Sequence, residues 1–154
     1  MWREKLARVI EIGKGYGVEM NEGATEAELA RLREAMGKLG FTIPEEYCDF
    51  LRVINGLESN GLALYGVDAE YLDKKPKQTG CGMVDGFESW NFDPEDTQRL
   101  YVGDKDISLY YYKQGKYIEL DIGNREDEYD VFHTIEDFLD YAFTFMIDDD
   151  DDVV

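Results

Sequence analysis

The sequence predicts an α+β fold in which N-terminal helices pack on an antiparallel or mixed sheet and a C-terminal helix closes the domain. Helical spacing of apolar residues runs through residues 2–54, alternation between glycine turns dominates residues 100–132, and helical spacing returns after Thr134. Such segregation of helices from strands is typical of α+β folds. With 154 residues, 44% of them hydrophobic, the chain can bury one core without staples.

The first two helices are predicted from spacing and from end signals. Trp2, Leu6 and Val9 share one helical face, and this first helix should end near Gly13. Thr25 and Glu28 form a capping box that starts a second helix, which Gly40 should end. Both termini of the second helix are therefore marked in the sequence.

A third helix and a short strand follow. Pro44 fits the first helical turn because its missing N–H is not needed there, and Asn55-Gly56 ends the helix. Asn60-Gly61 predicts a turn into a strand over 62–65 that Gly66 ends. Residues 68–98 are harder to interpret, with a short helix over 84–90 as one reading.

The strongest hairpin signal joins strands over 107–112 and 116–122 through Lys113-Gln114-Gly115, read as a three-residue loop with a bulge. Alternation places one set of side chains in the core: Ile107, Leu109, Tyr111, Ile118, Leu120 and Ile122. The opposite face is then aromatic and acidic.

The C-terminal part should comprise a strand over 129–132 and a helix that Thr134 caps and that fades near Ile147. Five consecutive aspartates follow, which should repel one another and fray at the negative end of a helix. We therefore expect a single domain over 1–147 and an acidic tail over 148–154.

Negative charge is concentrated in the second half of the chain. Residues 1–77 carry 14 acidic and 11 basic side chains, whereas residues 78–154 carry 21 and 5, within a net charge of −19. One reading is a field that attracts a basic partner and speeds its association; the other is simple solubility. Direct nucleic-acid binding is disfavoured because clustered lysine and arginine are missing from this half.

No self-sufficient catalytic, metal or cofactor site is expected. His133 is the one histidine, and a turn or packing role suits it better than catalysis. Cys48 and Cys81 lack metal-ligand spacing and read as free thiols in a reducing compartment. No phosphate-binding glycine motif occurs. With no signal-peptide pattern and no long apolar run, we expect a cytoplasmic protein that does not engage a membrane.

The aromatic and acidic face is the predicted partner-binding surface, because tyrosine is enriched at interface hot spots and carboxylates suit a basic protein. Its proposed residues are Tyr110, Tyr112, Tyr117, Glu119, Asp121, Glu126, Asp127 and Glu128. Further acidic loop residues could extend it: Glu88, Asp93, Glu95, Asp96, Asp104, Asp106 and Asp130. The open alternative is that another element covers this face and makes the tyrosines core.

The segment Phe41-Thr42-Ile43-Pro44-Glu45-Glu46-Tyr47, followed by Asn55-Gly56 and Gly61-Leu62-Ala63-Leu64-Tyr65-Gly66, resembles the signature of the SUKH superfamily, which includes cell-wall-assembly-regulator homologues. The matching motif positions are Pro44, Glu45, Tyr47, Asn55, Gly56, Gly61, Tyr65 and Gly66, at a helix start and a tight turn. Ile43 and Cys48 depart from the usual pattern. These positions bear on fold more than on function.

This resemblance implies a protein that acts by binding. Many bacterial members resemble immunity proteins that bind polymorphic toxins and block nuclease or related activity. We therefore expect an immunity-type protein that neutralises a basic, nuclease-like toxin domain by occluding its active surface. The alternative is a housekeeping scaffold or regulator of the same fold that has no toxin partner.

Overall fold

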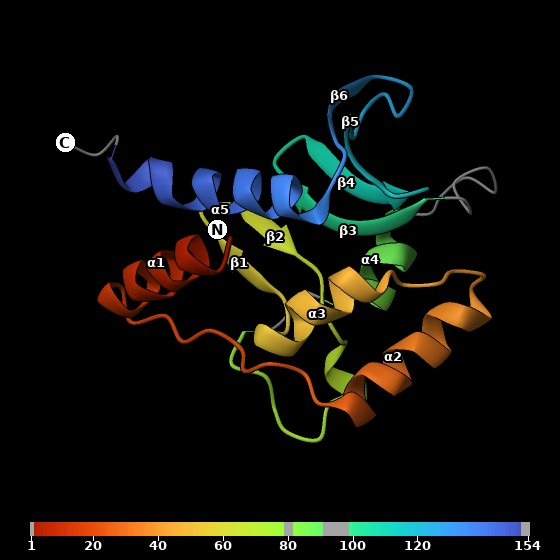
Figure 1. Cartoon of the computed structure of the whole chain (residues 1–154), viewed down its shortest axis with the longest axis horizontal. Coiled ribbons are helices and arrows are strands. Elements are labelled where there is room, and N and C mark those ends of the chain that lie inside the picture. The colour runs from red at the N-terminus through yellow and green to blue at the C-terminus, as the bar shows by residue number, and fades with distance from the viewer. Residues whose placement is uncertain (1, 79–81, 91–98, 152–154) are drawn as a thin grey trace.

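The computed structural model describes residues 2–78, 82–90 and 99–151, with backbone alone for 148–151, and its fold is α+β as predicted (Figure 1). Three helices open the chain: α1 (Trp2–Gly15), α2 (Glu26–Lys38) and α3 (Glu45–Val53). The elements that follow are β1 (Leu57–Ser59), β2 (Leu62–Leu64), the short 3₁₀ helix η1 (Ala69–Tyr71), α4 (Met83–Trp90), β3 (Leu100–Lys105), β4 (Ser108–Lys113), β5 (Lys116–Asp121), β6 (Glu128–Phe132) and α5 (Ile135–Asp151).

The strands form one antiparallel sheet in sequence order, β1-β2-β3-β4-β5-β6. Each strand therefore pairs with its neighbours in the chain, and β1 and β6 are the two edges. The long helix α5 crosses the sheet and lies beside α1, while α2, α3 and α4 are drawn below α5 and away from the C-terminus (Figure 1). A salt bridge of 2.9 Å between Lys5 and Asp140 joins α1 to α5.

The β4–β5 hairpin has the predicted pairing of faces but a different turn, and Ile107, which was expected in the core, lies just before β4 and is 63% exposed. Tyr110 pairs with Glu119 and Tyr112 with Tyr117, so these residues share one face. Lys113 pairs with Lys116, which leaves a loop of two residues instead of the expected three. Gln114 and Gly115 have φ values of 50° and 83°, as a type I′ turn requires. That turn matches the twist of the strands, so no bulge is needed.

Other element boundaries follow the sequence signals in part. The capping box of Thr25 and Glu28 is present, and Gly40 has a φ of 92° just after α2. The helix α4 starts one residue before the range considered, and β1 was not expected. The helix α5 continues to Asp151, so its backbone runs into the aspartates expected to fray. Residues 152–154 of the expected tail lie outside the described residues.

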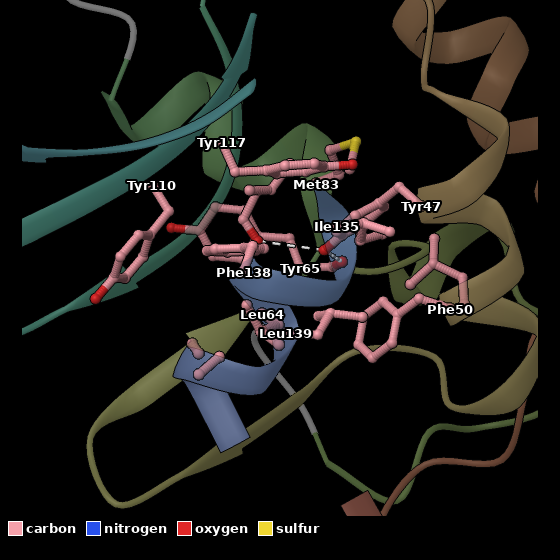
Figure 2. Packing of buried hydrophobic residues seen from close by; sticks show 14 of the residues in the cluster. Tyr47, Phe50, Leu64, Tyr65, Met83, Tyr110, Tyr117, Ile135, Phe138 and Leu139 are labelled. Carbon is pink, nitrogen blue, oxygen red and sulfur yellow. Dashed lines mark hydrogen bonds between the residues drawn. The ribbon is translucent and has the colours of Figure 1, made fainter. Parts of the chain in front are cut away.

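Two side chains of the α3–β2 region, those of Tyr47 and Asn55, hold the helices to the sheet. The Tyr47 hydroxyl, fully buried, donates to the Tyr65 carbonyl at 2.5 Å and lies 3.3 Å from the Val102 carbonyl (Figure 2). The Asn55 amide accepts from the Val67 N–H at 2.7 Å and donates to the Val67 carbonyl at 3.2 Å. This amide satisfies backbone groups that would otherwise be buried without partners.

The two glycines beside Asn55 allow this close approach. Gly56 has a φ of 69°, and a Cβ there would lie 2.7 Å from the Leu64 carbonyl oxygen. A Cβ on Gly66 would lie 2.5 Å from Asn55 Oδ1. Both positions therefore need glycine for conformation or for space.

The remaining motif residues also have structural surroundings. Pro44 is the N-cap residue of α3, and the Glu45 carboxylate accepts from Arg33 at 2.6 Å and from Arg52 at 2.8 Å. Gly61 has a φ of 82° in the β1–β2 turn, and the Tyr65 hydroxyl donates to Asp104 at 2.5 Å. The segment is therefore a junction of α3, β2 and β3.

Tyr47→Phe should lower the free energy of unfolding by about 1–3 kcal/mol, because it deprives the buried Tyr65 carbonyl of its donor. Urea denaturation followed by circular dichroism measures this change. Tyr16→Phe is the control, since Tyr16 is 73% exposed and should change stability by less than about 0.5 kcal/mol. Equal stability of Tyr47→Phe and wild type would contradict the assigned role.

Candidate functional site

The helix α5 covers the face of β4 and β5 that carries the tyrosines. Tyr110 and Tyr117 are both 0% exposed. The Tyr117 ring stacks on Phe138 of α5, with centroids 4.9 Å apart and planes 6° apart, and Tyr110 lies 5.5 Å from the same ring (Figure 2). Burial raises the pKa of both phenols above its usual value. These two tyrosines are core residues, as the alternative reading anticipated.

Glu119 is also enclosed beneath α5. Its carboxylate accepts from the Tyr141 hydroxyl at 3.1 Å and lies 3.7 Å from the Lys105 ammonium. Lys105 donates to the Tyr141 hydroxyl at 2.7 Å and lies 4.5 Å from the centre of the Phe145 ring. The two charged side chains are only 17% and 6% exposed. Glu119 therefore balances a partly buried lysine and is not available to a partner.

Three residues of the predicted partner-binding surface are buried, so the prediction was wrong for them. Tyr110, Tyr117 and Glu119 are inaccessible because the closing helix has an apolar face wide enough to seal the tyrosines. Tyr112 is half-buried and lies 5.1 Å from Tyr117 between ring centres. The other predicted residues, Asp121, Glu126, Asp127 and Glu128, remain at the surface or partly exposed.

The exposed carboxylates gather in the β5–β6 hairpin. We use the term acidic hairpin for Asp121, Glu126, Asp127, Glu128 and Asp130. The Asp121 N–H donates to the Asp127 carbonyl at 3.0 Å, which closes the connection between the two strands. All but Asp121, which is half-exposed, are exposed. The structure thus brings together one part of the predicted site and separates it from the tyrosines.

Asp121 shapes the turn of this hairpin. Its Oδ1 accepts from the N–H groups of Gly123 at 2.6 Å and Asn124 at 3.2 Å, and its Oδ2 accepts from the Tyr129 hydroxyl. The Tyr129 hydrogen bond, followed by that of Gly123, lowers the pKa of Asp121. The same Tyr129–Asp121 bond raises the pKa of Tyr129 to about 12. Asp121 is therefore ionised at neutral pH and fixed in place.

The basic side chain within the hairpin, Arg125, is engaged on the face of the sheet opposite α5. Its guanidinium donates to the Tyr101 hydroxyl at 3.1 Å and to the Trp90 carbonyl. Glu128 accepts from the Tyr111 hydroxyl at 2.6 Å. Burial, with this bond second, raises the pKa of Tyr111 to about 12. Arg125 and Glu128 therefore also fasten the hairpin to the sheet.

Glu126, Asp127 and Asp130 differ from Asp121 and Glu128, whose carboxylates accept hydrogen bonds from tyrosine hydroxyls. Within residues 2–78, 82–90 and 99–151, no side-chain hydrogen bond or ion pair holds these three carboxylates. Two unit charges about 10 Å apart repel by only about 0.4 kcal/mol in water, so the fold tolerates the cluster. Their common field nevertheless favours a positively charged partner.

The strand β6 adds apolar side chains that the sequence analysis did not assign to the surface. Tyr129 is 46% exposed and Val131 is 41% exposed, on either side of Asp130. The side chains of a strand alternate between two faces, and one face is ordinarily buried. For that reason the sequence alone did not indicate that Tyr129 and Val131 are exposed. The position of β6 at the end of the sheet explains it.

The remaining candidates for chemistry are two cysteines, one histidine and several acidic loop residues. Cys48 is a free, buried thiol whose pKa burial raises, and His133 is exposed between β6 and α5. Cys81 and three acidic loop positions, Asp93, Glu95 and Asp96, lie outside the described residues. In the part of the chain that the structure describes, no three His, Cys, Asp or Glu residues gather in a group able to hold a metal ion. Nor does any described helix combine the length and apolarity needed to cross a membrane.

Comparison with known proteins gives no relative: no protein-family model and no curated protein sequence matches the chain.

A double-mutant cycle tests the structural role of Glu119. Glu119→Leu should cost about 3–5 kcal/mol of unfolding free energy, because it leaves the Lys105 ammonium enclosed without its carboxylate. Lys105→Met should also lower the free energy of unfolding, because it leaves the buried Glu119 carboxylate without the ammonium group. The double variant should recover most of the lost stability. Chemical denaturation of all four proteins gives the coupling energy. Additive losses would show that the two charges do not stabilise each other.

Proposed function

We propose that this protein binds a basic protein partner through the acidic hairpin, and that the partner is a nuclease-like toxin domain which the protein neutralises. The observation that carries the proposal is the set of three exposed carboxylates, Glu126, Asp127 and Asp130, free of side-chain bonds to the described residues, beside the fixed carboxylates of Asp121 and Glu128. Acids already serving the fold could not be given to a partner without loss of stability, whereas these three can.

The charge of the whole chain supports this choice of partner. A net charge of −19 gives a field that draws a positively charged domain toward the molecule. A domain that cleaves nucleic acid needs a basic surface for phosphates, and carboxylates placed over that surface would compete with them. Occlusion of this kind needs tight binding and no catalytic residue, and its fast association would be sensitive to salt.

The toxin-neutralising part of the proposal comes from the resemblance to the SUKH superfamily. Membership in that superfamily is itself a proposal, carried by the junction of Tyr47, Asn55, Gly56 and Gly66, whose geometry explains why these residue types stand there. The proposal places the protein in the cytoplasm of a bacterium, where it would protect the cell that makes the toxin.

A charge-reversal triple variant, Glu126→Lys/Asp127→Lys/Asp130→Lys, should bind the partner with an association rate at least about tenfold lower, because steering by the hairpin is reversed. The control, Glu22→Lys/Glu34→Lys/Glu70→Lys, changes net charge equally at exposed positions outside the hairpin. Immobilised wild type, variant and control are exposed to lysate of the source organism at low salt. Proteins retained by wild type and control but not by the variant are identified and produced.

Inhibition then decides the function. We expect one basic protein with nuclease activity, which wild type inhibits at equimolar concentration and the triple variant does not. Retention of the same protein by all three forms would remove the hairpin as the binding surface. Recovery of housekeeping proteins alone, without any inhibited activity, would replace the immunity function with that of a scaffold or regulator.

A further inference from the structure

The two edge strands of the sheet, β1 and β6, differ in whether their outer backbone groups have hydrogen-bond partners among the described residues. At β1, the Gln78 side chain pairs with the backbone of Glu58: the Glu58 N–H donates to Gln78 Oε1 at 3.1 Å, and Gln78 Nε2 donates to the Glu58 carbonyl at 3.0 Å. This amide takes the place of a neighbouring strand. At β6, by contrast, no other described element hydrogen-bonds to the outer edge. Among the described residues, one edge of the sheet is capped by a side chain and the other has no such cap.

The open edge presents both acidic and apolar side chains. Glu128, Tyr129, Asp130 and Val131 are all exposed in succession. The register against β5 shifts between Ile118 and Leu120, which places their partners Val131 and Glu128 on the same face of the sheet. Figure 1 shows β6 at the outer end of the sheet, away from α1 and from the C-terminus of α5. An added strand would lie beside these side chains and could contact them on both faces of the sheet.

We propose that a basic, extended segment of the partner adds to β6 as a further strand of the sheet, an inference that rests on the proposed function. Backbone hydrogen bonds along the edge would supply affinity, and alternate side chains would supply specificity. Lysine or arginine would lie near Asp130, whose carboxylate has no bond to the described residues, while an apolar residue would cover Val131 on the other face.

The same charges argue against a second copy of this chain as the occupant. Edge-to-edge pairing of two β6 strands would bring Glu128 and Asp130 of one copy close to the same residues of the other, and like charges in facing strands are destabilising. Charged side chains on exposed edges are a common protection against self-association. The carboxylates of β6 would thus keep the edge free of other copies while leaving it open to a basic strand.

A pair of peptides separates strand addition from simple charge attraction. The probe is a short, fluorescently labelled peptide of alternating lysine and valine, and its match has the same sequence with every backbone nitrogen methylated. Both have the same charge and side chains, but the methylated form cannot donate backbone hydrogen bonds. Binding is followed by fluorescence anisotropy, and amide chemical shifts of the protein locate the site.

We expect the methylated peptide to bind about tenfold more weakly or worse, because it lacks the donors that pair with the edge. Shift changes caused by the unmethylated peptide should concentrate in residues 128–132. Asp130→Lys should weaken its binding, whereas Glu70→Lys, an exposed change outside the hairpin, should leave it within about twofold, as expected of screened charges.

The remaining outcomes overturn strand addition in distinguishable ways. Equal, salt-sensitive binding of both peptides would leave an acidic surface for a basic partner, as in the proposed function, but would exclude added backbone pairing. If the peptide did not bind at β6, strand addition would be excluded. The proposed function would then still rest on the partner captured from lysate. Conversely, the peptide could bind as expected while no inhibited toxin is found. That result would exclude the toxin-neutralising function and support strand addition at β6.

Discussion

The packing of α5 across the tyrosine face of β4 and β5 is the constraint on which the rest of the structure depends. It encloses Tyr110 and Tyr117 against Phe138, and it enforces a charge balance, because Glu119 and Lys105 both lie under the helix. A buried ion pair of this kind adds little net stability over apolar residues, but loss of either member is costly. The tyrosines and Glu119 therefore serve the fold and are withdrawn from recognition.

What remains for recognition is the β5–β6 turn and the exposed part of β6, beyond the contact of Phe132 with Phe138 and Tyr141 of α5. There the carboxylates divide into two kinds. Asp121 and Glu128 fix the hairpin through bonds to Tyr129 and Tyr111, and Glu126, Asp127 and Asp130 project a charge that the described part of the chain does not neutralise. Rigid attachment of the first set means that a partner would meet the second in a preformed arrangement, which reduces the ordering cost of binding.

Much of the fold could be predicted from the sequence because its local signals agree: the Thr25 capping box, Gly40 after α2, and the alternation that pairs Tyr110 with Glu119. The site was only half predictable. Alternation identified the shared face correctly, but whether α5 or solvent lies over it is a tertiary fact with no local signal. The two-residue turn was missed because Gln114, a residue uncommon at positive φ, adopts it together with Gly115. The extension of α5 to Asp151 was also not predicted.

Amide hydrogen exchange of the free protein and of its complex with the captured partner shows whether the partner binds at β6. We expect slow exchange in β4 and β5 in both states, because that face is sealed by α5. We expect fast exchange at the outer edge of β6 in the free protein and marked slowing there in the complex. Slowing confined to the helices α1 to α3, with residues 128–132 unchanged, would contradict this expectation.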